Sequence, residues 1–231
     1  MKKSIRSILI AGFTVLSLAN VQAAKSFEGV ITYDIKIDNS AGTIPQEEMS
    51  MFEGSQMIIS MKEGLSKVQM DLGPQQVTTI ANKKENYMMQ LFNLMGNKVA
   101  VKSNLDSLMK AGKAEADKPV FKYDSETKTI AGYLCKKAEM TVTDKKTGEK
   151  VTSVVYYTED IPVTEYNTSM QGIKGYPLQF EVHKSGIVMT MTAKTVDKKT
   201  LTNADFAIPA GYTQMTADQM KAMMQQMQSG H

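Results

Sequence analysis

The sequence predicts a mainly β protein, of the β-rich α+β class, built on one large curved antiparallel sheet. Three observations predict this half-barrel with one or two covering helices. Apolar residues recur at every second position over much of the chain, short polar turns separate these runs, and only two segments have helical spacing. A period of two is typical of strands that bury one face and leave the other wetter. We expect about ten strands between Phe27 and Val196.

The alternating runs are the predicted strands. The first run, residues 29–38, has four apolar side chains on one face: Ile31, Tyr33, Ile35 and Ile37. Four later runs have three each: Met57, Ile59 and Met61; Val68, Met70 and Leu72; Leu178, Phe180 and Val182; Ile187, Met189 and Met191. Since successive side chains of a strand point to opposite faces, each set can contribute to one core.

Short polar segments separate the runs. They are residues 62–64, 82–84, 144–148 and 184–186, and three of the four contain glycine. Such segments are typical of hairpin loops, so we expect successive strands to pair as a meander.

Two segments break this pattern. Residues 104–112 predict a short helix, with Asn104 as its N-cap and Gly112 as its end, followed by a polar linker at 113–118. The second helix is predicted after Thr216, its N-cap. Four methionines share one face there: Met220, Met223, Met224 and Met227.

Three segments are predicted along the chain. Residues 1–23 have the pattern of a cleavable secretory signal peptide, with a basic start, a short apolar run and a small-residue cleavage site. Residues 24–213 form the half-barrel domain, and residues 214–231 a helix or tail rich in methionine and glutamine. We therefore expect a periplasmic or secreted protein with no membrane span after cleavage. No cysteine near the cleavage site offers lipid attachment.

The charge balance argues against nucleic acid as a partner. The chain carries 27 Lys+Arg and 24 Asp+Glu, and three of the positive charges are Lys2, Lys3 and Arg6. Cleavage would remove these three, leaving a formally neutral protein without the positive excess that nucleic acids attract. The oligomeric state stays open.

Few residues are available for catalysis. His183 is the only histidine besides the terminal His231, and no serine has a nucleophile-elbow pattern. No close set of His, Cys or carboxylate residues predicts a metal site, and no phosphate-binding glycine loop is present. We therefore predict a non-enzymatic protein with no catalytic residues, metal ligands or cofactor. Cys135, the only cysteine, is expected to be a buried thiol in a strand.

Methionine is unusually frequent, with 19 residues in the chain. Three interpretations compete. Methionine fills irregular gaps in a core, and it also lines adaptable apolar cavities that suit lipid tails. Thioethers are also ligands for copper(I).

The segment 128–142 (KTIAGYLCKKAEMTV) resembles uncharacterised envelope proteins of Bacteroidota that share a domain of unknown function. Three further segments carry this resemblance: 156–162 (YYTEDIP), 175–181 (GYPLQFE) and 206–212 (FAIPAGY). Their order is also similar to the related GLPGLI family, although GYPL stands at 175–178 in place of that family's diagnostic motif. The resemblance implies a curved half-barrel like that of the periplasmic lipoprotein carriers, with an apolar concavity. It implies no catalytic residues.

The favoured function is binding of an apolar ligand, such as a lipid or acyl chain, in the concave face of the sheet. The candidate lining residues are the apolar members of four predicted strands: Met57, Ile59, Met61, Met70, Leu72, Phe180, Met189 and Met191. Each of them would also serve as plain core. Two alternatives stay open: a copper(I)-binding protein that uses methionine clusters, and a structural or interaction module of the cell envelope.

Overall fold

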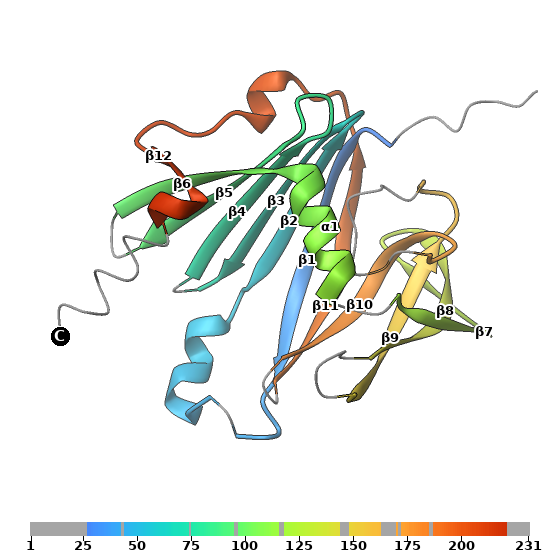
Figure 1. Ribbon diagram of the computed structural model, residues 1–231. Coiled ribbons are helices and arrows are strands. Elements are labelled where there is room, and N and C mark those ends of the chain that lie inside the picture. The colour runs from blue at the N-terminus through green and yellow to red at the C-terminus, as the bar shows by residue number, and fades with distance from the viewer. Residues whose placement is uncertain are drawn as a thin grey trace, which may run out of the picture.

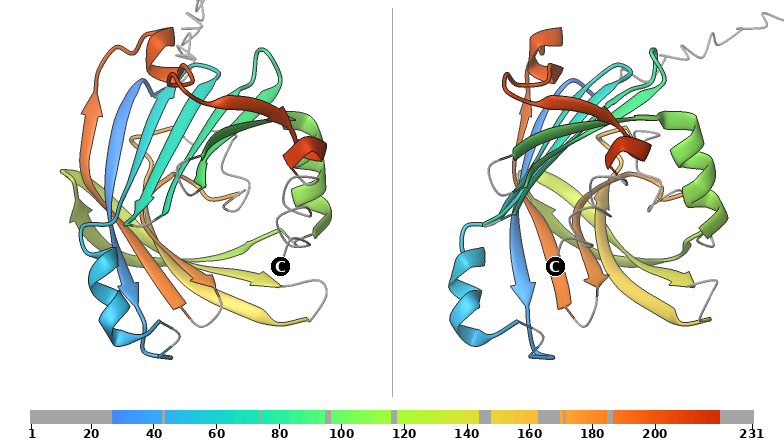
Figure 2. Two further views of the ribbon diagram at one scale, coloured as in Figure 1. Left: turned by 90° about the vertical axis from the view of Figure 1, so that its left-hand side faces the viewer. Right: turned by 60° about the vertical axis from the view of Figure 1, so that its left-hand side comes forward.

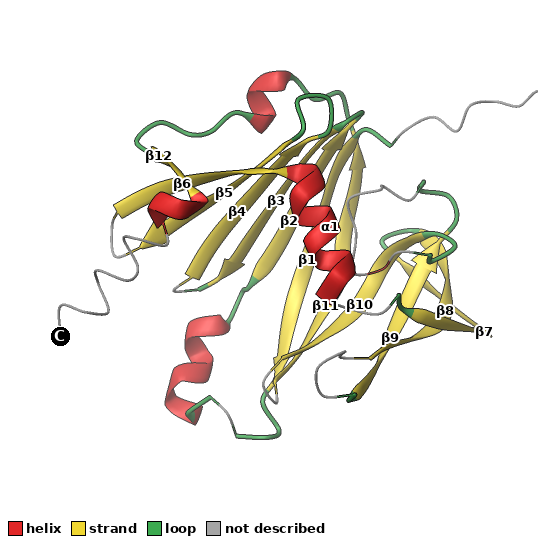
Figure 3. Cartoon of the chain, viewed as in Figure 1, coloured by secondary structure: helices red, strands yellow, loops and turns green. Residues whose placement is uncertain are grey.

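The computed structural model describes residues 27–42, 44–73, 75–94, 97–115, 118–143, 148–162, 170, 172–184 and 187–220. The predicted signal peptide at 1–23 and most of the predicted C-terminal helix lie outside these residues. The described chain consists mostly of strands (Figure 3).

The strands form a single sheet and are numbered in chain order (Figure 1). Their bounds are β1 Gly29–Asp38, β2 Gln56–Lys62, β3 Leu65–Leu72, β4 Gln75–Asn82, β5 Tyr87–Leu94, β6 Asn97–Asn104, β7 Val120–Ile130, β8 Tyr133–Thr143, β9 Lys150–Thr158, β10 Tyr176–Lys184, β11 Ile187–Lys198 and β12 Thr213–Thr216. The helices are α1 (Leu105–Glu115) and the short 3-10 helices η1 (Gln46–Phe52) and η3 (Asn203–Phe206).

Two meanders build the sheet. Strands β1 to β6 pair in sequence, as do β7 to β11, and β1 pairs with β11 to join the two sets, all antiparallel. Only β12 pairs in parallel among the described strands, against β6. The sheet curves strongly, and α1 lies across the open side of the curve (Figure 2). The predicted fold class, a curved antiparallel half-barrel with few helices, is confirmed.

The predicted turns join paired strands. Residues 62–64 connect β2 to β3, and residues 82–84 belong to the turn between β4 and β5. Strands β8 and β9, and β10 and β11, pair as the other two predicted hairpins require.

The prediction for the first helix was wrong at its end. Asn104 caps the helix as expected, because its side chain accepts a hydrogen bond from Ser107 N at 2.9 Å. However, α1 continues through Gly112 to Glu115, three residues into the predicted linker. A single glycine costs a helix only about 1 kcal/mol, and the Lys, Ala and Glu that follow it are good helix formers. At the second helix, Thr216 Oγ1 accepts from Gln219 N at 3.2 Å, so this predicted cap is confirmed.

The two faces of the sheet have separate cores. On strands β1 to β3 and β11, the concave face carries a cluster that includes Ile31, Tyr33, Met57 and Met191. On the convex face of β4 to β6, a second cluster contains Ile80, Met89, Leu91 and Ala100. A third cluster lies on β8 and β9 and packs against Met170 and Ile173, which precede β10 in the chain.

Residues 199–212, here called the strap, cross the convex face between β11 and β12. The strap buries Leu201 and Phe206 in the convex cluster, at 4% and 5% exposure. Leu201 N donates to Glu28 Oε1 at 2.7 Å, and Lys62 Nζ donates to the Leu201 carbonyl at 2.5 Å. The Thr202 amide and hydroxyl both donate to the Asp205 carboxylate, which fixes the start of η3. The strap therefore completes a core that the strands alone would leave uncovered.

Candidate ligand-binding face

The structure places all eight predicted lining residues in one apolar cluster. They come from β2, β3, β10 and β11, and all belong to the concave cluster. Met57, Met61 and Met191 are buried, at 4%, 2% and 2% exposure. The other five are half-buried: Ile59, Met70, Leu72, Phe180 and Met189. Whether any of them touches a ligand stays a prediction.

Strand register explains why these residues meet. Met57 on β2 pairs directly with Met70 on β3, and Phe180 on β10 pairs with Met191 on β11. Side chains of directly paired residues lie about 5 Å apart at Cβ and point to the same face. Their alternation in the sequence therefore becomes contact in the sheet.

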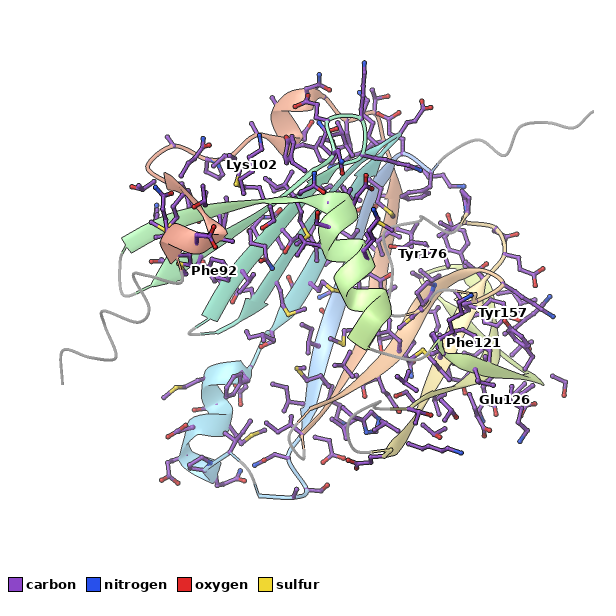
Figure 4. The ribbon with its side chains drawn as sticks, in the orientation of Figure 1. Phe92, Lys102, Phe121, Glu126, Tyr157 and Tyr176 are labelled. Atoms are coloured by element: carbon purple, nitrogen blue, oxygen red, sulfur yellow. The ribbon has the colours of Figure 1, made fainter. Side chains whose placement is uncertain are left out.

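The same register extends across six strands as a row of directly paired residues. We call it the apolar row, and it consists of Tyr33, Met57, Met70, Val77, Phe92 and Val99. Its ends are buried, whereas Met70, Val77 and Phe92 in the middle are half-buried. The side chains in the middle of the apolar row, on β3 to β5, are therefore only partly covered on the concave side (Phe92 is labelled in Figure 4).

Sequence reasoning missed Val77 and Phe92, and it assigned Tyr33 only to a core. The alternation of Val77, Thr79 and Ala81 was available in the sequence as a signal. Threonine and alanine weaken that signal, because neither is strongly apolar. Pairing β4 with β5 supplies what the pattern lacked, since Val77 then faces Phe92.

Charge separates the two faces. Among the described residues of β1 to β6, no charged residue lies at a concave position, and on β11 the charged residue on that side is Lys198 at the end of the strand, which pairs with Gly29. The alternate, convex positions of these strands carry ten charged residues: Asp34, Lys36, Asp38, Lys62, Lys67, Asp71, Lys98, Lys102, Lys194 and Asp197. Burying an unpaired charge is costly, so this division suits an apolar interior and a solvated exterior.

Two buried tyrosines lie where the concave cluster meets β10. Tyr33 is fully buried, and its hydroxyl donates to the Pro177 carbonyl at 2.8 Å. Tyr176 is 6% exposed. Burial raises the pKa of both phenols above the usual value, because a phenolate would lose its hydration. Both therefore stay neutral hydrogen-bonding groups in the folded protein.

This burial predicts a loss of stability at alkaline pH. Tyrosines in the unfolded state ionise near pH 10, whereas the buried tyrosines of the folded state stay protonated to higher pH. Ionisation above pH 10 therefore stabilises the unfolded state. The free energy of unfolding should fall above about pH 10, by about 1.4 kcal/mol per pH unit for each tyrosine. Tyr33→Phe should make this fall shallower. Urea unfolding over a pH series checks it, and equal slopes in the two proteins would contradict it.

A cluster of ionisable groups lies near the irregular part of β7. Glu126 accepts hydrogen bonds from the Tyr156 hydroxyl and, at 2.7 Å, from Lys137 Nζ, and the ammonium lowers the pKa of this carboxyl. Lys128 Nζ lies 3.7 Å from the Tyr156 ring centroid and donates to Gln179 Oε1 at 2.6 Å. Burial lowers the pKa of Lys128. These groups satisfy one another and hold β7 against β9 and β10 (Glu126 is labelled in Figure 4).

Cys135 and His183 were the other chemically active side chains noted in the sequence. The predicted burial of Cys135 is confirmed, at 0% exposure, and that burial raises the pKa of the thiol. His183 is exposed, with Nε2 3.5 Å from Glu181 Oε2. No group of three or more His, Cys, Asp or Glu residues within the described ranges could hold a metal ion.

The methionines are spread over both faces. Met88 and Met89 are neighbours in the sequence, but Met89 lies in the convex cluster and Met88 on the opposite face. Met51 on η1 is 53% exposed. Of the C-terminal methionine stripe, only Met220 lies within the described residues. The copper(I) alternative stays a prediction.

A pocket of about 230 Å³ lies mainly on the convex face of β2 to β4, and Met70 is the one residue of the predicted site in its lining. Its lining is mostly polar: Gly54, Gln56, Ile58, Gln69, Met70, Asp71, Gln76 and Thr78. This polar hollow does not suit an apolar ligand, so the concave face is the better candidate.

None of the helices in the described part of the chain is long and apolar enough to cross a bilayer.

No family model matches the chain, and no curated protein gives a significant match. Among solved structures, the chain is similar to lipoprotein LppX of Mycobacterium tuberculosis, with a TM-score of 0.39 and 8% identity, over 77% of this chain and 90% of that chain. It is also similar to LprF from Mycobacterium bovis, with a TM-score of 0.37 and 13% identity, over 82% and 92%. Both likenesses are too distant to bear on function.

Proposed function

We propose that the protein is a non-enzymatic, exported envelope protein that binds an apolar ligand, such as a lipid or acyl chain, against its concave face. One observation carries the proposal. The concave side of β1 to β6 is uncharged at its described positions, and the middle of the apolar row, with Met70 and Phe92, keeps partly exposed side chains. Covering apolar surface of this kind with an apolar molecule removes it from water and is therefore favourable.

The proposed location has a separate basis. Export rests on the signal-peptide pattern of residues 1–23. The proposed kinship with Bacteroidota envelope proteins rests on the four sequence segments that resemble them.

The proposed function is tested by identifying the molecules that are bound to the purified protein. The full chain is purified from the periplasm or medium of an expressing cell, extracted with organic solvent and analysed by mass spectrometry. We expect a lipid in near-stoichiometric amount, and displacement of a fluorescent fatty acid by added lipid. Protein that carries no lipid and binds neither a fluorescent fatty acid nor a neutral lipid would overturn the proposal.

A further inference from the structure

We propose that the concave face also holds a site for an uncharged, hydrogen-bonding head group, formed by Thr79 and Gln90. This inference rests on the proposed function and specifies its ligand as a neutral amphiphile. Thr79 on β4 and Gln90 on β5 are directly paired. They lie one register step from Val77 and Phe92, in the open middle of the apolar row.

Two serines extend this polar site. Ser66 on β3 is diagonal to Thr79, because Val68 pairs with Thr79 and Ser66 lies two residues before it. Ser103 on β6 is diagonal to Gln90 in the same way, through Val101. The concave positions that flank this group are apolar: Val68, Val77, Ala81, Met88, Phe92 and Val101. The four side chains therefore form a small polar group among these apolar neighbours.

These polar groups have no hydrogen-bond partners among the residues that the structure describes. None of the side chains of Thr79, Gln90, Ser66 and Ser103 makes a hydrogen bond within the described part of the chain, and Thr79 and Gln90 are half-buried. Two glutamines on the convex face, by contrast, are paired: Gln56 donates to Asp34 at 3.1 Å and Gln76 to Asp71 at 3.1 Å. An amide has two N–H donors and a carbonyl acceptor, and a ligand that excludes water must satisfy them.

The electrostatics select the chemistry of the head group. No cation lies at the described concave positions of β1 to β6, so a buried carboxylate or phosphate would have no counter-charge there. Leaving such an anion unpaired is costly, whereas hydroxyl, ester or amide groups can exchange hydrogen bonds with Gln90 and Thr79. The acyl chain would then follow the apolar row from Val77 through Met70 toward Met57.

The test compares two probes with the same acyl chain, monooleoylglycerol and oleate, at a pH where the carboxylate is ionised. Binding to the full chain is measured by displacement of a fluorescent fatty acid and by calorimetry. We expect monooleoylglycerol to bind at least tenfold more tightly than oleate. Gln90→Leu should remove this preference by weakening monooleoylglycerol alone. The matched control Gln69→Leu, on the exposed convex face of β3, should leave both affinities unchanged.

Thr79→Val, which keeps the shape of the side chain, provides a second test if Gln90→Leu unfolds the protein. It should also weaken monooleoylglycerol selectively. Equal affinity for the two probes, tighter binding of oleate, or an unchanged preference in the folded variants would overturn the head-group site and leave the proposed function standing. Failure of both probes to bind the parent protein would overturn both.

Discussion

Replacing Phe206 in the strap with alanine is expected to lower the free energy of unfolding by about 3–5 kcal/mol. Phe206 is 5% exposed and packs in the convex cluster with Ile80, Met89 and Leu91. Truncation would remove most of a buried ring and leave a cavity that the rigid sheet cannot close. Urea denaturation measures the change.

Met51→Ala is the control for Phe206→Ala. Met51 is a large apolar residue, but it is 53% exposed on η1. Its loss should change the free energy of unfolding by no more than about 0.5 kcal/mol. Since Phe206 lies on the convex side, lipid affinity of the folded Phe206→Ala protein should be unchanged. A loss of stability below about 1 kcal/mol would show that the strap is not held by this ring.

Placing a carboxylate at Met70 is expected to weaken lipid binding by about two orders of magnitude. Met70→Glu puts a negative charge in the middle of the apolar row, where no cation lies at the described concave positions. Covering that charge with an acyl chain costs several kcal/mol, and about 2.7 kcal/mol is a hundredfold in affinity. Displacement of a fluorescent fatty acid gives the affinity.

Gln69→Glu makes the same change of charge one residue away on the exposed convex face. It should leave lipid affinity unchanged, so the two variants separate the position of the charge from its presence. The uncharged variant Met70→Gln should weaken binding by a smaller factor and checks the effect of polarity alone. Equal lipid affinity in Met70→Glu and Gln69→Glu would contradict binding on the concave face.

The strands could be predicted from the sequence because the alternation of apolar and polar residues that identifies a strand is a local pattern. Side-chain alternation at Ile31, Tyr33 and Ile35 identifies β1 and its buried face without knowledge of its neighbours. Which strands pair depends on residues far apart in the chain. The pairing of β1 with β11 joins Gly29 to Lys198, and no local pattern indicates it.

Short or irregular elements were the hardest to predict. Strand β12 has only the residues TQMT, which have no apolar alternation, and it pairs because the strap brings it to the edge of β6. It also lies across the predicted boundary between residues 213 and 214, and the predicted division into segments stays a prediction. The end of α1 depended on the balance between Gly112 and the helix formers after it.

The candidate site was predictable in its apolar part and not in its polar part. Met57 and Met70 were selected because strong apolar alternation places them on one face, and the pairing of β2 with β3 brings them together. Thr79 and Gln90 are typical surface residues in composition. Only the register of β4 against β5 reveals that they share the concave face with Val77 and Phe92.

The parallel pairing of β12 with β6 affects the order in which the chain can fold. Thr213 pairs with Val99, more than a hundred residues earlier, so the edge of β6 stays unpaired until the strap has docked. Contacts between distant residues form slowly, and an open strand edge can pair with another chain in the meantime. During synthesis, the edge of β6 therefore stays open to pairing with other chains until β12 arrives.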